Sequence, residues 1–187
     1  MCSSDLSIED MTRDELSGIR VDGREPIPRL EEVMSAWPDL FVNLDCKTAA
    51  AEEPLLRYLA THDVLHRVCV GSFSDARLET FRERLGPGLC TSTGPREVAR
   101  LVFAVGRATR ARSTPALAAQ VPVKQGPLPV VTSRFIRTCH EADLAVHVWT
   151  VNDASSMNTL LDQGVDGIMS DETRILRDVM TARGLPL

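Results

Sequence analysis

Two spacings of apolar residues alternate along most of this chain. Short stretches rich in branched and aromatic residues, with an apolar side chain at every second position, predict strands, whereas longer stretches with apolar residues three or four positions apart predict helices. Strands are predicted over 41–46, 67–73, 89–91, 116–120, 144–149 and 167–169. Each is followed by a predicted helix, over 52–61, 74–85, 95–106, 131–142, 154–163 and 173–182. Such a succession of strand–helix units is typical of a parallel sheet with right-handed crossovers.

Two weaker helical signals precede the first predicted strand. Thr12, with Glu15 three positions later, has the pattern of a capping box, in which each side chain accepts a hydrogen bond from the other residue's backbone. A second short helix is predicted over 30–36 and ends before Trp37, because a residue that precedes proline is disfavoured in the helical region.

A parallel sheet of this kind either closes as a β/α barrel or stays open as a doubly wound sheet. The sequence has no G-x-G-x-x-G after its first predicted strand and no G-x-x-x-x-G-K-[ST], so the usual signs of a nucleotide-binding open sheet are absent. With 187 residues the chain is shorter than a complete eight-unit barrel of roughly 250 residues. We therefore expect an α/β fold, a partial TIM-type barrel of about six of the eight units with parallel strands and outer helices. The alternative is an open α/β sheet with the N-terminal helices folded over its edge.

Composition and charge exclude several classes of partner. The net charge of −5 is modest and the basic residues are scattered, which predicts no nucleic-acid partner. The longest apolar runs, such as 116–119 and 144–146, are far shorter than the roughly 20 residues of a membrane span. Acidic residues near the start, with no apolar segment there, predict no signal peptide. We expect a cytoplasmic protein with no membrane span.

The cysteines are widely spaced and form no C-x-x-C pair. They are Cys2, Cys46, Cys69, Cys90 and Cys139, and some fall in apolar, strand-like stretches. This pattern predicts small, buried, reduced thiols rather than zinc ligands or a nucleophile.

The alternation of side chains along the strands places polar groups in the barrel interior. In the first strand the apolar side chains at 40, 42, 44 and 46 should face the helices, which leaves Asn43, Asp45 and Lys47 for the interior. Asp45 and Lys47 lie at the C-terminal end of this strand, where barrel enzymes place their active sites. The same argument places His147 and Trp149 of the fifth strand inside, with Trp149 at the same rim.

Each of these side chains also has a purely structural interpretation. Asp45 and Lys47 can form an interior ion pair, although charges there are costly without a task. Trp149 can simply fill the barrel mouth. A hydrogen-bonded interior role explains His147 better than catalysis does. The remaining histidines are interpreted as surface, loop or helix-end residues: His62, His66 and His140.

Two stretches resemble the ending of a known family. Residues 146–153, V-H-V-W-T-V-N-D, and residues 164–171, G-V-D-G-I-M-S-D, are similar to the last strand regions of the glycerophosphodiester phosphodiesterases, barrels of the phosphatidylinositol-specific phospholipase C-like type. Three weaker matches occur in the family's order, at 27–33, 43–47 and 72–73. The chain is therefore identified as a member of this family over nearly its whole length, as one barrel domain, 1–187.

The resemblance implies a hydrolase of lipid metabolism that cleaves glycerophosphodiesters to an alcohol and glycerol 3-phosphate. It implies a divalent metal, Ca or Mg, held by carboxylates, with two histidines as general base and acid. On the positions matched here it implies Asp45 as a metal ligand, Lys47 as a catalytic residue against the phosphate and Trp149 as a substrate-binding residue. Asp45 stands where the family usually has glutamate, which draws the carboxylate back by roughly 1.5 Å.

The family's other site residues should precede Thr12. Its His-Arg-Gly, its Glu-x-Asp pair and a following histidine have no counterpart in residues 1–11. We therefore expect the first two barrel strands, with the main acid/base and metal motifs, to be missing. The loop 171–173 also lacks the family's usual arginine and proline. An alternative function is a non-catalytic barrel remnant that binds a phosphorylated ligand or a partner chain.

A barrel that lacks two strands has open sheet edges and wet apolar surface. Apolar surface that stays exposed to water lowers the stability of the fold by of order 25 cal/mol per Å². The open edges favour self-association. We expect that residues 1–7 are not the native start and that the chain alone is marginally stable and inactive.

Overall fold

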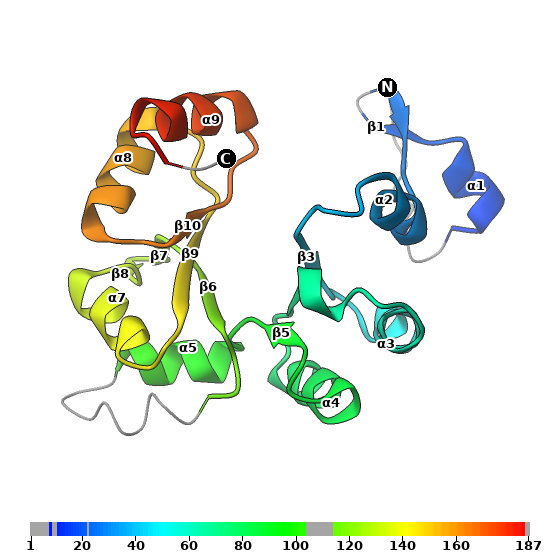
Figure 1. The fold of residues 1–187 in the computed structure, drawn as a ribbon, viewed down its shortest axis with the longest axis horizontal. Helices are drawn as coiled ribbons and strands as arrows, with labels where there is room; N and C mark the ends of the chain where they lie inside the picture. The colour runs from blue at the N-terminus through cyan, green and yellow to red at the C-terminus, as the bar shows by residue number, and fades with distance from the viewer. Residues whose placement is uncertain (1–7, 9–10, 22, 104–113, 186–187) are drawn as a thin grey trace. The chain divides into compact units, whose positions relative to one another are not determined.

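The computed structural model describes residues 8, 11–21, 23–103 and 114–185 (Figure 1). The chain divides into two compact units, residues 1–40 and 41–187. Within the described residues, no helix is long and apolar enough to cross a membrane.

The described part of the first unit contains two helices and a small hairpin. Helix α1 (Arg13–Ser17) begins with the expected capping box: Thr12 Oγ1 accepts a hydrogen bond from the Glu15 backbone at 3.4 Å, and Glu15 Oε2 accepts one from the Thr12 backbone at 2.7 Å. Helix α2 (Leu30–Ala36) has the predicted bounds. The hairpin was not predicted, because strands of two residues are too short to show an alternating pattern. Its strands are β1 (Arg20–Val21) and β2 (Glu25–Pro26).

The second unit is built on parallel strands that follow one another in chain order. In its described part the order is β3-β4-β5 in one sheet and β6-β9-β10 in another, and a parallel bridge from Ser92 to Ala118 joins them. This order confirms the predicted partial β/α barrel with six parallel strands among the described residues. The strands are β3 (Val42–Asp45), β4 (Val68–Gly71), β5 (Cys90–Thr91), β6 (Ala118–Pro122), β9 (Ala145–Trp149) and β10 (Gly167–Ile168).

A helix follows each of these strands, as the sequence predicted. Threonine, serine or aspartate side chains cap the N-termini of several of them, at Thr48, Ser74, Thr132 and Asp153. The helices are α3 (Ala49–Thr61), α4 (Asp75–Leu85), α5 (Pro95–Val102), α7 (Ser133–His140), α8 (Ala154–Gln163) and α9 (Thr173–Ala182).

The structure differs from the sequence prediction around β6. The strand begins two residues later than predicted, and a short antiparallel hairpin follows it, with Gly126 in its turn at a φ of 57°. The helix predicted over 95–106 ends at Val102, and residues 104–113 lie outside the described residues. A short 3-10 turn (Leu65–Arg67) precedes β4. The hairpin strands are β7 (Lys124–Gln125) and β8 (Leu128–Pro129).

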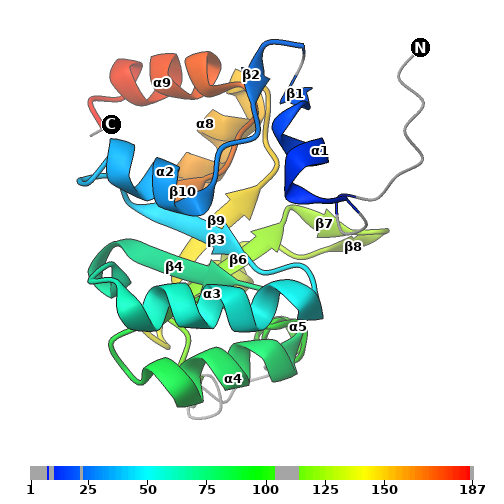
Figure 2. The same cartoon turned by 90° about the vertical axis from the view of Figure 1, so that its right-hand side faces the viewer.

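The helices pack on one face of each sheet, and the apolar core lies between. Helices α3 and α4 lie side by side along the β3–β4 strands (Figure 2), where Val70 and Phe81 are fully buried. On the other sheet, Leu144, Val146 and Val148 are buried against α7 and α8, as the alternation in this strand predicted. The chain thus places its branched apolar side chains between strand and helix.

The opposite face of the sheets carries polar, half-exposed side chains. Gln120 of β6 donates a hydrogen bond from Nε2 to Asn43 Oδ1 of β3 at 3.0 Å, although β4 and β5 lie between these strands in the sheet order. The two side chains can meet only if the strands curve around a common interior, as in a barrel.

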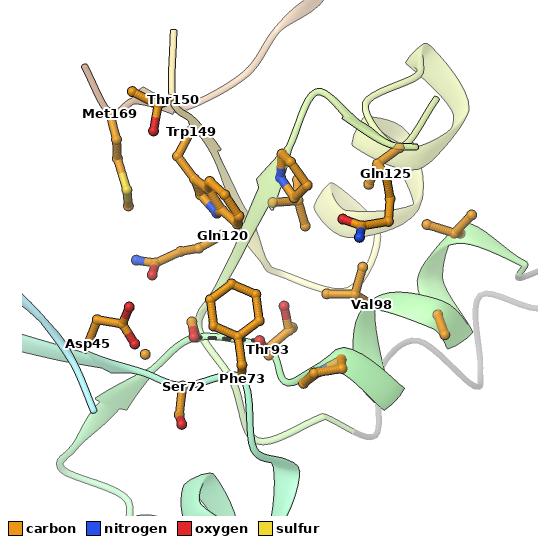
Figure 3. A pocket seen from close by; sticks show the side chains of 18 of the residues that line it. Asp45, Ser72, Phe73, Thr93, Val98, Gln120, Gln125, Trp149, Thr150 and Met169 are labelled. Atoms are coloured by element: carbon orange, nitrogen blue, oxygen red, sulfur yellow. Dashed lines mark hydrogen bonds between the residues drawn. The ribbon is translucent and has the colours of Figure 1, made fainter. Parts of the chain in front are cut away.

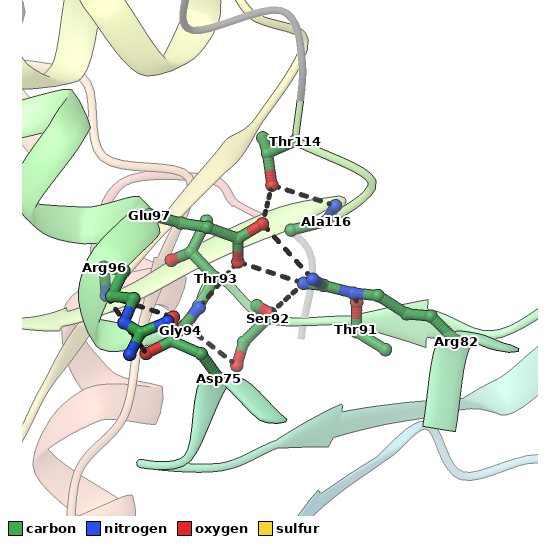
Figure 4. A network of polar contacts seen from close by, with 10 residues as sticks. All are labelled: Asp75, Arg82, Thr91, Ser92, Thr93, Gly94, Arg96, Glu97, Thr114 and Ala116. Carbon is green, nitrogen blue, oxygen red and sulfur yellow. Dashed lines mark hydrogen bonds and ion pairs between the residues drawn. The ribbon is translucent and has the colours of Figure 1, made fainter. Parts of the chain in front are cut away.

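A part-buried polar network lies at the joint between the two sheets (Figure 4). Arg82 of α4 donates to both Glu97 oxygens at 3.2 and 3.1 Å, to Thr91 Oγ1 at 2.8 Å and to the Ser92 carbonyl at 3.0 Å. Burial alone raises the pKa of Glu97, but hydrogen bonds from Arg82, Thr114 and Gly94 outweigh it and lower the pKa below its usual value. The network therefore ties α4, α5 and the end of β5 to the start of β6.

Replacing Glu97 by glutamine should destabilise the second unit by about 3 kcal/mol, because it leaves the mostly buried Arg82 charge without its partner. The lowered pKa means that the carboxylate contributes fully above its usual value and loses its effect as pH falls through the folded-state value. The difference between wild type and Glu97→Gln should therefore shrink at acidic pH. Urea unfolding at several pH values measures it.

The matched control is Glu53→Gln, which breaks the exposed ion pair with Arg84. We expect little change in stability from that substitution, since exposed pairs contribute little. Equal effects of the two substitutions would contradict the role assigned to the network.

Candidate functional site

A cavity of about 690 Å³ opens at the C-terminal ends of the second unit's strands. Figure 3 shows side chains from several strand ends converging on it. Its volume lies within the roughly 300–1,000 Å³ of typical small-molecule sites. The polar side chains on its lining include Asn43, Asp45, Lys47, Ser72, Ser92, Thr93 and Gln120.

The two charged residues predicted at this rim lie together on the cavity lining. Asp45 is the last residue of β3, and the Lys47 ammonium donates to its Oδ2 in an ion pair. The Asp45 side chain is 34% exposed and that of Lys47 is 71% exposed. Both groups can therefore reach a ligand without leaving the strand end, and a phosphate would compete with Asp45 for the Lys47 ammonium.

Trp149, the third predicted residue, lines the same cavity from the end of β9. Its ring meets Phe73 edge to face, with the ring centroids 5.9 Å apart and the planes at 85°. The Phe73 side chain is 68% exposed. Strand alternation predicted the position of Trp149. The strand predicted over 67–73 included Phe73, but β4 ends at Gly71, so Phe73 lies in the loop that follows.

Ser72 and Arg77 hold the polar end of the cavity in shape. The Ser72 hydroxyl donates to the Cys46 carbonyl at 2.8 Å, and Arg77 donates to the same carbonyl and to Ser72 Oγ, each at 2.9 Å. These bonds tie the chain just after β3 to the chain just after β4. Arg77 was not predicted from the sequence, because the pattern of residues along a helix does not show which strand end an arginine side chain contacts.

Below the cavity, two cysteines face each other on neighbouring strands. Cys69 of β4 and Cys90 of β5 are register partners, and Gln120 Nε2 donates to Cys69 Sγ at 3.8 Å. A hydrogen bond from the Cys69 thiol lowers the pKa of Cys90 to about 7, and the same bond, with burial, raises the pKa of Cys69. Cys90 is therefore the reactive thiol of the pair.

The other described cysteines agree with the prediction of buried thiols. Cys46 and Cys139 are buried and reduced, and burial raises the pKa of both, that of Cys139 to about 12. Cys69 and Cys90 are reduced but only half-buried, so the prediction of burial is wrong for them. The side chains of Cys69 and Cys90 lie on the inner face of the sheet and not on the face that packs against the helices. Cys2 lies outside the described residues.

The two stretches that resemble the family, 146–153 and 164–171, contain residues that join the last strands of the barrel. Asp166 Oδ2 accepts from the Val146 backbone at 2.7 Å and bonds His140 Nε2 at 2.8 Å. Gly167 lies beside His147 in register, and a Cβ on this glycine would come within 2.7 Å of the imidazole. Burial lowers the pKa of His147, which keeps the ring neutral near pH 7.

The Asn152 side chain holds the loop that follows β10 by hydrogen bonds. Its Oδ1 accepts from the Asp171 backbone at 3.0 Å and from the Ser170 hydroxyl at 3.1 Å. These contacts give the stretch a structural role at the rim next to Trp149.

The described residues fit a hard cation only in part. Asp45 and the Asn43 amide oxygen point to one cavity, but Asn43 Oδ1 already accepts from Gln120. Among the described residues, no group of three or more His, Cys, Asp or Glu side chains is arranged to hold a metal ion. Magnesium is commonly held by one or two carboxylates with water and substrate phosphate, so Asp45 can supply one side of such a site.

Most of the sequence matches the model of a known family. Residues 1–175 match the model of the glycerophosphoryl diester phosphodiesterase family. The chain belongs to this family. A Mycobacterium tuberculosis protein named "Probable glycerophosphodiester phosphodiesterase 2" is 36% identical over 164 residues, which cover 86% of this chain and 62% of that protein. The chain thus spans less than two thirds of the length of this curated relative.

Solved structures of other family members share the fold. A glycerophosphoryl diester phosphodiesterase from Parabacteroides distasonis aligns with a TM-score of 0.70 at 19% identity, over 96% of this chain and 66% of that one. One from Thermotoga maritima aligns with a TM-score of 0.67 at 20% identity, over 94% and 73%. At these identities the likeness is evidence for the fold alone. It agrees with the partial barrel seen here.

The lowered pKa of Cys90 predicts a pH-dependent reaction with iodoacetamide. Because the thiolate is the nucleophile, the alkylation rate of Cys90 should rise through about pH 7. In Cys69→Ala the thiol donor is gone, so the pKa of Cys90 should rise and the midpoint should move to higher pH. Peptide mass spectrometry of a time course measures both rates.

Cys69→Ser is the matched comparison, because its hydroxyl keeps a donor, and Cys46 and Cys139 serve as internal slow-reacting controls. If the alkylation rate of Cys90 in the wild type had its midpoint at about pH 8.5, the value of an ordinary thiol, the Cys69–Cys90 interaction would be contradicted.

Proposed function

We propose that this chain forms the substrate-binding part of an enzyme that hydrolyses glycerophosphodiesters to an alcohol and glycerol 3-phosphate with a divalent cation. Membership of the family supports this reaction class. The observation that carries the proposal is that Asp45, Lys47 and Trp149 line one cavity at the C-terminal strand ends. Barrel enzymes work at this end of the sheet.

Lys47 binds a non-bridging phosphoryl oxygen of the diester. Its ammonium is largely exposed and is held next to the cavity by Asp45. An ammonium in this position attracts the negative charge of the diester and stabilises the additional charge that develops in the transition state. Lys47 is thus the catalytic residue of this chain.

Asp45 is a ligand for the cation, with Ca and Mg as the candidates because both prefer oxygen ligands. When bound, such a cation neutralises phosphodiester charge and acidifies a bound water. Asp45 would hold the cation, and Lys47 would bind the phosphate beside it. Trp149 and Phe73 contact the alcohol or glycerol part of the substrate through their ring faces and edges.

The alternative is that the chain binds a phosphorylated ligand without turning it over. It is favoured by the absence of histidine from the described residues that line the cavity, since the family resemblance implies histidines as acid and base. In both functions Lys47 contacts the phosphate of the ligand. Only the hydrolase releases a product.

Lys47→Gln should weaken the binding of glycerophosphocholine by about tenfold, because a charge-assisted hydrogen bond to the phosphoryl oxygen is lost. Isothermal titration calorimetry with magnesium or calcium present measures the affinity. Lys124→Gln is the matched control, since these are the two lysines of the sequence and Lys124 lies in β7, outside the described cavity lining.

A parallel assay of glycerol 3-phosphate release decides between the two functions. Cation-dependent release that is lost in Lys47→Gln and Asp45→Asn supports the hydrolase. Binding without release supports the binding-only alternative. Equal affinity of wild type and Lys47→Gln would remove Lys47 from the site.

A further inference from the structure

One layer of the barrel interior brings two thiols and two amides together. Asn43, Cys69 and Cys90 are register partners on the neighbouring strands β3, β4 and β5. Gln120 of β6 completes this layer, because its Nε2 donates to Asn43 Oδ1 at 3.0 Å and to Cys69 Sγ at 3.8 Å. The interior of a β/α barrel is ordinarily filled with branched apolar side chains, so this layer departs from what packing alone requires.

The two cysteines have the position that a disulfide requires. Cys69 and Cys90 lie opposite each other in the parallel ladder. Adjacent strands are about 4.8 Å apart, and a disulfide joins Cα atoms that are roughly 4.4–6.8 Å apart. No change of strand register is therefore needed for the two sulfur atoms to bond. Both thiols are reduced and half-buried, whereas Cys46 and Cys139 are buried.

The hydrogen bonds of the layer give the two thiols different roles. The Gln120 amide donates to Cys69, and the Cys69 thiol in turn donates to Cys90. Hydrogen bonds in such a chain polarise one another, which concentrates the negative charge of the pair on Cys90. The bond between the thiols is the largest cause of the lowered pKa of Cys90, about 7, and of the raised pKa of Cys69. Cys90 is therefore the nucleophile, and Cys69 is the neighbouring thiol that can resolve its oxidation product.

Gly71 leaves the space that this arrangement needs. It lies two positions after Cys69, on the same face of β4, and lines the cavity. A Cβ on this glycine would come within 3.3 Å of Gln120 Oε1 and 3.4 Å of Ser92 Oγ. The glycine thus leaves room for the Gln120 side chain that contacts the thiol pair. Because both cysteines keep part of their surface exposed, a small oxidant can reach them.

We propose that Cys69 and Cys90 form an oxidation site at which hydrogen peroxide converts the two thiols to a disulfide. The Cys90 thiolate attacks one peroxide oxygen, the O–O bond breaks, and the second oxygen leaves as hydroxide, which takes up a proton. The Cys69 sulfur then attacks the resulting sulfenic sulfur. An S–S bond forms, and the S–O bond breaks as water leaves with the Cys69 proton. Two thiols and one peroxide thus give one disulfide and two waters, and the site is independent of the proposed function because no ligand of the cavity takes part.

Peptide mass spectrometry of the reduced, whole chain treated with hydrogen peroxide at neutral pH tests the site. Free thiols are blocked with N-ethylmaleimide before digestion, so that no exchange follows. Trypsin places the two cysteines in different peptides, residues 68–77 and 85–96, because arginines flank both of them. Without a reducing agent, these peptides should be recovered as one disulfide-linked pair that dithiothreitol separates.

Cys90→Ser should lower the initial rate of thiol loss from the pair at least about threefold. The large thiolate fraction of Cys90 is then lost, and the lower intrinsic nucleophilicity of that thiolate offsets only part of the difference. Cys69→Ser should still form the Cys90 sulfenic acid, which dimedone traps, but no linked peptides. Cys46→Ala is the matched control: that thiol is buried with a raised pKa, so the variant should give the linked pair at the wild-type rate. Circular dichroism checks that each variant is folded.

Three results in the wild-type chain would overturn the site, and none of them depends on a variant. If the two peptides stay unlinked, whether they keep the maleimide label or carry a sulfinic acid, the pair forms no disulfide. If Cys90 is linked mainly to another cysteine of the chain, its partner is wrong. An equal yield of the Cys69–Cys90 pair from the chain unfolded in urea would show that the strand register is not its cause.

Discussion

The mostly buried ion pair between Arg82 and Glu97 lies where the two three-stranded sheets of the described chain meet. Their side chains are only 14% and 12% exposed, so each charge depends on the other for its solvation. Around this pair the strands β5 and β6 are joined by one parallel bridge rather than a full ladder. Two backbone hydrogen bonds cross there, from the Thr93 N–H to the Ala118 carbonyl at 2.8 Å and from the Leu117 N–H to the Thr91 carbonyl at 3.0 Å, and the side-chain bonds of Arg82 lie beside them. The joint connects the sheet that carries Asn43 with the sheet that carries Gln120, whose side chains meet across the interior.

Each strand packs its apolar side chains against the helices on one face and carries its polar side chains on the other. The outward face carries Val70, Val146 and Val148, which helices cover completely. The inward face carries carboxylate, amide, thiol and imidazole groups that are partly exposed. Because side chains alternate along a strand, one short strand such as β3 can serve both purposes, with Leu44 outward and Asp45 inward. The cavity forms where this inward face reaches the C-terminal ends of the strands.

The motif that identifies the family has a mostly structural role in this part of the barrel. Asp166 and Asn152 satisfy backbone N–H groups of the last units, and Gly167 leaves room for the His147 ring. Three members of these stretches line the cavity: Trp149, Thr150 and Met169. A strong sequence signature can therefore mark the scaffold of a site more clearly than the groups that perform the chemistry.

The amino-acid sequence by itself determined the order of strands and helices, the capping box at Thr12 and the inward direction of Asp45 and Trp149. These are local properties, set by periodicities of two and 3.6 residues and by groups a few positions apart. Only the tertiary structure decided which distant groups meet. The Asn43–Gln120 bond joins residues 77 positions apart, and the Cys69–Cys90 and Arg82–Glu97 pairs depend on strand register and on a helix crossing. The β7–β8 hairpin likewise depends on packing that no local pattern records.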